Sequence, residues 1–189
     1  MLNAETPRLK FALYGAQGSL GSAVLVELLS RQHEAVALLD DLNALTARPG
    51  LRTKPGDLHD PTGVSESVAG MDAVLCLFDA AAPPEAFASA VKALLVGLPR
   101  VAVDRLLLVA DFPHLADQPP VVAALQRLAA DPLRWTLVDA APVQPGLGID
   151  DLAAAGDGPQ LRALRRLAAG IVDELEQPLH LRERIRFSD

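Results

Sequence analysis

The sequence predicts an α/β protein with a doubly wound parallel sheet and helices on both faces, folded as a single domain over residues 1–189. Short runs rich in valine and leucine alternate along the chain with segments of helical periodicity, which is the pattern of successive β-α-β units. A glycine-rich turn joins the first of these runs to the first helical segment. The length of 189 residues suits one domain.

The first half of the chain supplies four expected strands and two expected helices. The strands are apolar runs over Leu9–Tyr14, Ala35–Leu39, Arg52–Lys54 and Ala73–Phe78. The last of these is unbroken by charge, as a buried parallel strand is. A helix over 19–31 is predicted because apolar side chains recur four residues apart on one face, at Leu20, Val24 and Leu28. Asp60-Pro61 is a typical helix start, and Gly70 ends that second helix.

The second half continues the alternation. Helices are expected over 84–96, 121–130 and 160–177, and strands over 105–109, 135–138 and 185–187. Proline-rich pieces follow the fourth, fifth and sixth strands, at 82–84, 118–120 and 141–146. An open α/β sheet builds its ligand site at that edge.

Composition excludes several classes of function. The net charge is −7, the isoelectric point is about 5.0 and the mean hydropathy is +0.23. An acidic surface argues against nucleic acid and anionic membranes as partners. One cysteine excludes a disulfide framework, and no apolar run approaches the ~20 residues of a membrane span. With no signal-peptide pattern at the start of the sequence, we expect a cytoplasmic protein.

The sharpest motif is the glycine turn Gly15-Ala-Gln-Gly-Ser-Leu-Gly21. In a strand–turn–helix context, one glycine allows the bend, one lets a pyrophosphate approach the backbone, and one lets the helix pack against the strand. Free amides at the helix start then receive the phosphates. The predicted cofactor contacts are Gly15, Gln17, Gly18, Ser19, Leu20 and Gly21. The alternative is a purely structural tight turn.

Two carboxylates extend this expected dinucleotide site. Asp40 follows Gly21 by 19 residues, close to the spacing of the acidic residue that binds the adenosine ribose. A carboxylate there would repel a 2′-phosphate, so NAD(H) is favoured over NADP(H). In the alternative, Asp40 and Asp41 end the strand and cap a helix over 42–47. Asp57 is expected at the adenine amino group, or else in solvent or an Asx turn.

The chain resembles the atypical short-chain dehydrogenase/reductase family, in its NmrA-like and NADH-flavin reductase branch. The resemblance is carried by 15–21, Gly56-Asp57 with Asp60, Ala73-Val-Leu-Cys76, Trp135-Thr136, Pro145-Gly146, and Val172–Pro178 with His180 and Arg184. It implies a Rossmann-like NAD(P)-binding domain, nicotinamide dinucleotide binding at the first turn, and flavin reduction with FMN or FAD as the substrate.

The chain departs from this family at several positions. Members of the branch often carry a basic residue where this chain has Asp40, and a threonine where it has Gln17. The family's catalytic pair is a tyrosine with a lysine four residues on, supported by a serine. The single tyrosine here is Tyr14, and the residue four beyond it is Gly18. The sequence excludes that mechanism.

Hydride transfer to a flavin requires less of the protein, because the two rings do the chemistry. The expected lining is formed by the loops over 79–84 and 111–120, where His114 and Asp111 are the candidate catalytic residues. The alternative for His114 is an exposed loop histidine. His33 and His59 are expected at the surface, Cys76 in the core, and the arginines at 162, 165 and 166 on a solvated helix face. No metal site is predicted.

Two functions therefore remain open, and a third is a further alternative. One is an NAD(H)-dependent oxidoreductase acting on a flavin. The second is a regulatory protein of NmrA type that senses the dinucleotide without turning it over, which the missing catalytic set favours. The third is a fold that has lost its cofactor and acts through protein contacts. Helices rich in alanine and leucine make a homodimer a further expectation.

Overall fold

The computed structural model describes residues 7–141, 143 and 146–187. Within them, a seven-stranded sheet has the order β3-β2-β1-β4-β5-β6-β7, and every neighbouring pair is parallel. The strands are β1 (Lys10–Tyr14), β2 (Glu34–Leu39), β3 (Leu51–Pro55), β4 (Ala73–Leu77), β5 (Arg105–Ala110), β6 (Arg134–Asp139) and β7 (Glu183–Ile185). The direction of winding reverses between β1 and β4, which makes their carboxyl ends the natural ligand site.

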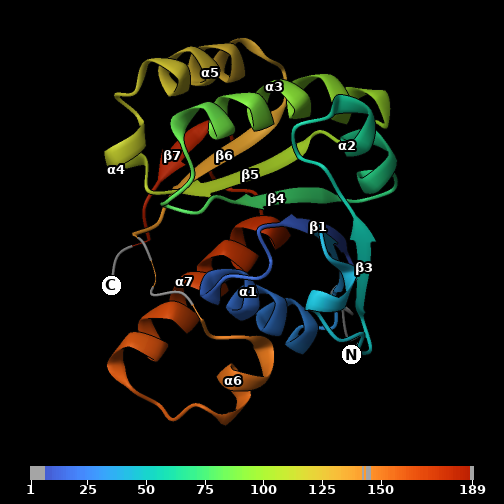
Figure 1. Cartoon of the computed structure of the whole chain (residues 1–189), viewed down its shortest axis with the longest axis vertical. Helices are drawn as coiled ribbons and strands as arrows, with labels where there is room; N and C mark the ends of the chain where they lie inside the picture. Colours follow the sequence, from blue (N-terminus) through green and yellow to red (C-terminus); the bar gives the residue numbers. More distant parts are fainter. Residues whose placement is uncertain (1–6, 142, 144–145, 188–189) are drawn as a thin grey trace, which may run out of the picture.

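Helices cover both faces of the sheet (Figure 1). They are α1 (Ser19–Ser30), α2 (Pro61–Val68), α3 (Pro84–Arg100), α4 (Phe112–Leu115), α5 (Pro119–Ala130), α6 (Ile149–Ala154) and α7 (Pro159–Glu176), with the 3-10 turn η1 (Leu42–Ala44). One layer holds α1, α6 and α7, and the other holds α2, α3 and α5. Each layer buries its own apolar cluster against the sheet. The predicted doubly wound α/β fold is confirmed.

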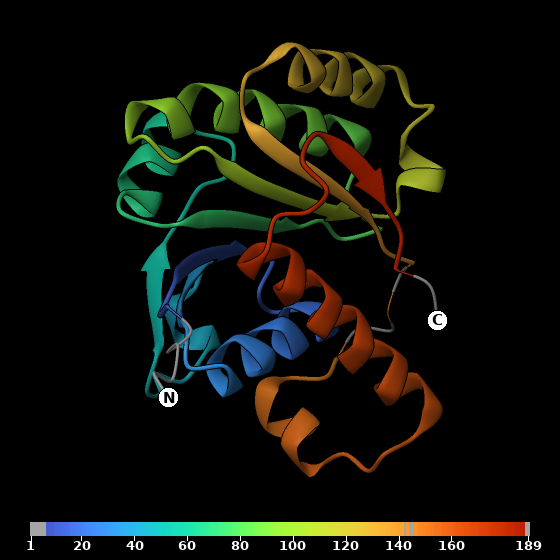
Figure 2. The ribbon, with the colours of Figure 1, turned by 180° about the vertical axis from the view of Figure 1, so that it is seen from behind.

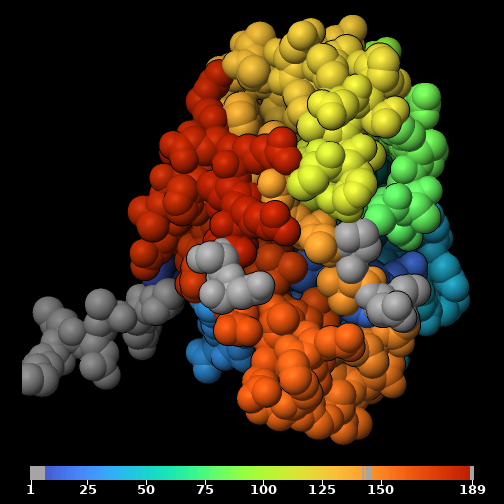
Figure 3. All heavy atoms as spheres, turned by 90° about the vertical axis from the view of Figure 1, so that its left-hand side faces the viewer, coloured from blue at the N-terminus to red at the C-terminus, as the bar shows by residue number. Residues whose placement is uncertain are grey.

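The carboxyl ends of the later strands face one side of the molecule. Figure 2 shows β6 and the short terminal β7 running side by side toward that side. Figure 3 looks onto it and shows the C-terminal segment (red) beside the region of α6 and the start of α7 (orange). The chain between β6 and α7 is therefore close to the C-terminal segment at the edge where the site is expected.

Some predicted elements differ from the observed ones. The expected helix over 42–47 is only the 3-10 turn η1, because none of its residues is buried to hold a longer helix. The terminal strand was expected over 185–187, but it lies two residues earlier, as β7, which begins at Glu183 and ends at Ile185. Two short helices, α4 and α6, lie in segments that the sequence analysis treats as loops. By contrast, α2 starts as predicted, since the Asp60 side chain accepts from the amides of Thr62 and Gly63.

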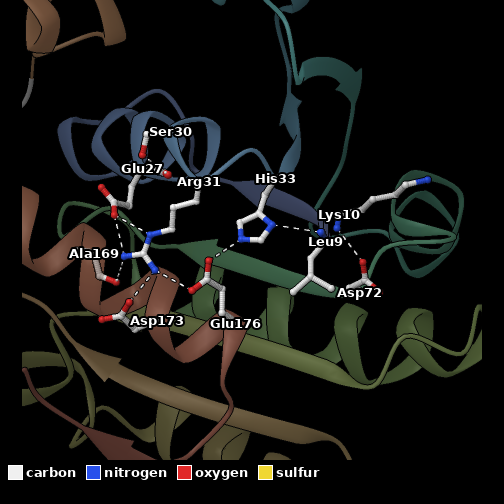
Figure 4. A network of polar contacts seen from close by, with 10 residues as sticks. All are labelled: Leu9, Lys10, Glu27, Ser30, Arg31, His33, Asp72, Ala169, Asp173 and Glu176. Carbon is white, nitrogen blue, oxygen red and sulfur yellow. Dashed lines mark hydrogen bonds and ion pairs between the residues drawn. The ribbon is translucent and has the colours of Figure 1, made fainter. Parts of the chain in front are cut away.

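His33 lies in the interior, which corrects the expectation of a surface position. Its side chain is 1% exposed. The Leu9 amide donates to its Nδ1 at 3.2 Å, and its Nε2 lies 2.6 Å from Glu176 Oε1 (Figure 4). Because Nδ1 accepts a hydrogen bond, Nε2 carries the proton and donates to the carboxylate. Burial is possible because both ring nitrogens are paired with groups from the start of β1 and the end of α7.

Arg31 joins α1 to α7 beside this histidine (Figure 4). Its guanidinium is 2.8 Å from Glu27, 2.7 Å from Asp173 and 2.8 Å from Glu176. Burial lowers the pKa of Arg31, but the hydrogen bonds to Asp173 and Glu27 and the charge of Glu176 outweigh it and raise this pKa above its ordinary value. The two helices are thus fixed together at the end of the molecule opposite the predicted site.

A buried ion pair attaches α7 to the sheet. Arg105 Nη2 donates to Glu174 Oε1 at 2.8 Å, and the two side chains are 4% and 3% exposed. Arg105 also donates to Thr136 Oγ1 at 2.9 Å, and His180 Nδ1 lies 2.7 Å from Glu174 Oε2. Burial lowers the pKa of Arg105 to about 10, although the charge of Glu174 opposes this. The cluster fixes the position of α7 relative to β5, β6 and the C-terminal segment.

Candidate functional site

The turn between β1 and α1 has a geometry that only glycine allows at two of its positions. Gly15 has φ +78°, and a Cβ atom there would lie 2.1 Å from the carbonyl oxygen of Leu77 in β4. A Cβ at Gly21 would lie 2.5 Å from the carbonyl oxygen of Gly15. The first glycine therefore permits the bend, and the third permits α1 to start directly against the turn.

Gly18 is different, because a Cβ atom added to it would meet no heavy atom within 4 Å. Its φ of −75° and ψ of 171° suit any residue. It is the N-cap of α1, and no side chain caps the helix. The first amides of a helix have no partner within it, and the space beside Gly18 at the start of α1 is not filled by a side chain. This open cradle at a positive helix end fits a pyrophosphate.

A cleft of about 590 Å³ opens in front of the turn. It is bounded by the start of α1 and by the segments that follow β4, β5 and β6. Its described lining is Gly15, Gln17, Gly18, Ser19, Leu20, Gly21, Leu77, Phe78, Asp79, Ala80, Ala81, Val109, Ala110, Asp111, Ala140, Ala141 and Val143. All six predicted contacts of the glycine turn thus line one cleft at the carboxyl edge of the sheet. The proline-rich piece at 141–146 borders it too, but its residues 142, 144 and 145 lie outside the described residues.

A second, smaller cavity of about 230 Å³ lies on the other side of the turn. Its lining includes Asp40 at the end of β2 and Asp57 after β3. Gly15 and Gln17 line both cavities. The turn therefore has a cavity on each side of it, and the two predicted carboxylates occupy only the smaller one. An extended ligand with a central diphosphate matches this layout.

The structure separates the roles of the two neighbouring aspartates. Asp41 caps η1, since its Oδ1 accepts from the Asn43 amide at 2.9 Å. Asp40 is exposed, lines the smaller cavity and has no hydrogen bond or ion pair to any described residue. The capping role that was the alternative for this pair therefore belongs to Asp41, and the Asp40 carboxylate is available to a ligand.

Asp57 forms the Asx turn that the sequence analysis raised as its alternative. Its Oδ1 accepts from the His59 amide at 2.8 Å. Its side chain is exposed at the cavity, and no described residue bonds Oδ2. The Asx turn fixes the direction of the Asp57 carboxylate and uses only one of its two oxygens.

The two candidate catalytic residues form a pair. Asp111 Oδ2 lies 2.7 Å from His114 Nδ1, and the side chains are 11% and 82% exposed, respectively. Asp111 lines the cleft, whereas His114 does not. The Asp111 carboxylate therefore lies at the cleft, whereas the His114 imidazole lies in solvent. Its Nδ1 donates to Asp111.

Tyr14 and Cys76, two further groups that carry an ionisable proton, are unsuited to proton transfer. Tyr14 is buried in β1, and burial together with the charges of Cys76 and Asp57 raises its pKa above the ordinary value. Burial likewise raises the pKa of the Cys76 thiol, which is fully enclosed in β4 as expected. Neither group supplies an acid or a nucleophile at neutral pH.

A third cavity, of about 610 Å³, adjoins the cleft and was not predicted from the sequence. It lies between α7, the chain after β6 and the C-terminal segment, and its lining includes Arg166 and Arg186. Arg166 was expected on a solvated face, and it is exposed, but it borders this cavity as well. No local pattern reveals the cavity, because its walls are separated in the sequence and meet only when β7 pairs with β6.

In the described part of the chain, no three histidine, cysteine, aspartate or glutamate side chains come together in a way that suits a metal ion. None of the described helices combines the length and the apolar character needed to cross a bilayer.

Several known proteins are similar to this chain. A family model described as NAD(P)H-binding matches residues 15–144. A Burkholderia pseudomallei protein provisionally assigned as exported is 25% identical over 94% of this chain and 98% of its own, with a TM-score of 0.71. None of the curated proteins compared with this chain matches it.

Two more distant structures share the fold. One, from Streptococcus pneumoniae and provisionally assigned as an NADH-flavin reductase, is 21% identical over 94% of this chain and 98% of its own, with a TM-score of 0.62. The other, the Bordetella bronchiseptica enzyme WbmH in complex with NAD+, is 15% identical over 96% of this chain and 75% of its own, with a TM-score of 0.70.

Proposed function

The chain belongs to the NAD(P)H-binding family, in agreement with its sequence resemblance, and on that premise we propose that it is an NAD(H)-dependent reductase that uses the 15–21 turn. The pyrophosphate lies in the cradle at Gly18, with the first amides of α1 as its donors. The adenosine lies toward Asp40 and Asp57, and the nicotinamide toward the segments after β4, β5 and β6. Two cavities that share Gly15 and Gln17 are the observation that carries this proposal.

The preference for NAD(H) over NADP(H) is proposed from Asp40. Its carboxylate accepts hydrogen bonds from the ribose hydroxyls and repels a 2′-phosphate. The observation that supports this role is that Asp41, and not Asp40, caps η1. Asp57 is proposed to accept from the adenine amino group through the oxygen that the Asx turn leaves free.

We further propose a flavin as the acceptor. When bound, the nicotinamide would supply a hydride for the flavin N5, and a proton taken from solvent would complete the reduced ring. The chain's own contribution is to hold the two rings in contact and to manage that proton. The Asp111 carboxylate in the cleft, paired at 2.7 Å with the exposed His114, suits proton exchange between the site and solvent.

A fluorescence titration with NADH and NADPH is the first test. The nicotinamide is the reporter to follow, because Trp135 lies at the start of β6, at the end of the sheet opposite the cleft. Saturable binding with NADH bound more tightly than NADPH is the expected result. Failure of both to bind would refute the proposal and favour action through protein contacts.

Turnover of NADH with added FMN then separates the two remaining functions. Oxidation of NADH is expected for the reductase, and replacement of Asp111 by Asn should lower kcat more than it changes KM. The second candidate, a dinucleotide sensor of NmrA type, is favoured by the burial of Tyr14 and the lack of a catalytic lysine beside it. Tight NADH binding with no oxidation by any flavin would identify that function. A cytoplasmic location and a homodimer remain predictions.

A further inference from the structure

The 610 Å³ cavity beside the cleft has the size and position of an acceptor site. Small-molecule sites commonly enclose ~300–1,000 Å³. It shares Ala140, Ala141 and Val143 with the cleft in front of the glycine turn. A molecule in this cavity would therefore lie against the end of the cleft that is proposed for the nicotinamide.

The walls of the cavity are largely apolar and are held in place by the fold. They come from Val143, Leu147, Ala155, Leu161, Leu164, Leu167 and Phe187. Phe187 packs directly on the backbone of α7, since a Cβ atom at Gly170 would lie 3.0 Å from its ring. The buried Arg105–Glu174 pair fixes α7 relative to the sheet. These walls suit the face of a planar, apolar ring.

The charges at the cavity are positive, in a chain whose net charge is −7. Arg166, Arg186 and Asp139 are the charged residues of its described lining. Asp139 is neutralised by Arg184, whose Nε donates to it at 2.7 Å. Arg166 and Arg186 have no hydrogen bond or ion pair to any residue that the structure describes. Two uncompensated guanidinium groups beside an apolar wall select an anionic group, such as a phosphate or a carboxylate.

We propose that this cavity binds the acceptor, a molecule with a planar apolar ring and an anionic group, and that Arg166 and Arg186 bind the anion. The role as acceptor rests on the proposed reductase function, whereas the binding itself does not. Among flavins, the site then discriminates FMN, which carries a phosphate, from riboflavin, which lacks it.

The test compares these two flavins by quenching of their fluorescence on the protein saturated with NAD+. NAD+ occupies the dinucleotide cleft and cannot reduce a flavin, so the flavin must bind outside that cleft. The variant Arg166→Gln/Arg186→Gln removes both charges at exposed positions. Arg162→Gln, on the same helix but away from the cavity, is the matched control. Thermal unfolding of all three proteins checks that the fold is kept.

We expect FMN to bind at least about tenfold more tightly than riboflavin, as a charge-assisted contact implies. The double variant should lose this preference without weaker riboflavin binding, and Arg162→Gln should keep it. Equal binding of the two flavins, or a preference that survives in the double variant, would overturn the proposal. FMN binding that NAD+ abolishes would overturn it too. So would a protein whose measured mass is that of a dimer and which does not bind the flavin, because dimerisation would then close the cavity.

Failure of the reductase proposal would give a different result. If NAD+ does not bind, the same titrations without it still measure the flavin preference and its dependence on the two arginines. The protein would then prefer FMN through the two arginines and yet not bind NADH. That result would support the proposed anion site and refute the proposed reductase function.

Discussion

Replacement of Gly18 by valine separates binding from folding in the glycine turn. The added side chain meets no heavy atom within 4 Å, and the backbone at φ −75° and ψ 171° suits a β-branched residue. Valine is a poorer N-cap than glycine, but it restricts the unfolded chain. These effects oppose each other, so we expect the free energy of unfolding to change by less than about 1 kcal/mol.

The effect on cofactor affinity should be far larger. The isopropyl group would fill the cradle proposed for the pyrophosphate at the start of α1. Loss of two hydrogen bonds to a charged group, at roughly 1.5–3 kcal/mol each, weakens NADH binding by at least about 100-fold. A fluorescence titration with NADH measures this loss, and thermal unfolding measures stability in the same preparation.

Two other glycines provide the controls. Gly156→Val adds the same side chain where nothing lies within 4 Å and no described cavity is lined, so both NADH affinity and stability should stay unchanged. Gly15→Val should fail to fold, because of its φ of +78° and the 2.1 Å approach to the Leu77 carbonyl. A folded Gly18→Val protein that binds NADH as tightly as the parent would refute the assignment of the turn to the pyrophosphate.

Three further predictions concern the adenosine cavity and the core. Asp40→Arg should shift the ratio of NADH to NADPH affinity by about tenfold or more toward NADPH, and an unchanged ratio would mean that Asp40 does not contact the ribose. Because burial raises the pKa of Cys76 and keeps the thiol protonated, Ellman's reagent at pH 8 should label it only in denaturant; fast labelling of native protein would contradict its burial. Glu174→Gln leaves the buried Arg105 without a countercharge and should cost about 3 kcal/mol of unfolding free energy by urea titration. Asp173→Asn, on the same helix but exposed, should cost less than about 0.5 kcal/mol. Equal losses of unfolding free energy in the two variants would show that the loss in Glu174→Gln does not come from the buried charge.

Local patterns predicted the elements that depend on local chemistry. The uncharged run that begins at Ala73 forms the strand β4, which ends at Leu77. Helix α2 starts after Asp60 because the Asp60 side chain caps it and proline suits its first turn. The glycine turn was likewise predictable, since bend, open cradle and close packing are each properties of one residue type. The predicted helix over 42–47 was wrong because helical residues with no buried face receive no packing energy.

Long-range pairing was invisible in the sequence. The burial of His33 depends on Glu176, 143 residues away, which accepts from its ring. The buried Arg105 depends in the same way on Glu174, 69 residues away. An isolated histidine or arginine has a strong average preference for the surface, and only the docking of α7 on the sheet reverses it. The cavity beside the cleft was missed for the same reason.

The docking of α7 also separates the two ends of the proposed ligand site. The turn, Asp40 and Asp57 belong to the half of the sheet built from β1 to β3, and they can define where a dinucleotide lies without any help from the C-terminal segment. The segments proposed for the nicotinamide and the acceptor come after β4. The last wall of the proposed acceptor cavity, Phe187, packs against α7 at Gly170. Since the buried Arg105–Glu174 pair anchors α7 on the sheet, the cavity proposed for the acceptor does not depend on a bound dinucleotide for its shape. Binding of the two ligands should therefore be close to independent, and a sensor that reports NADH through a rearrangement of α7 would first have to break the Arg105–Glu174 pair.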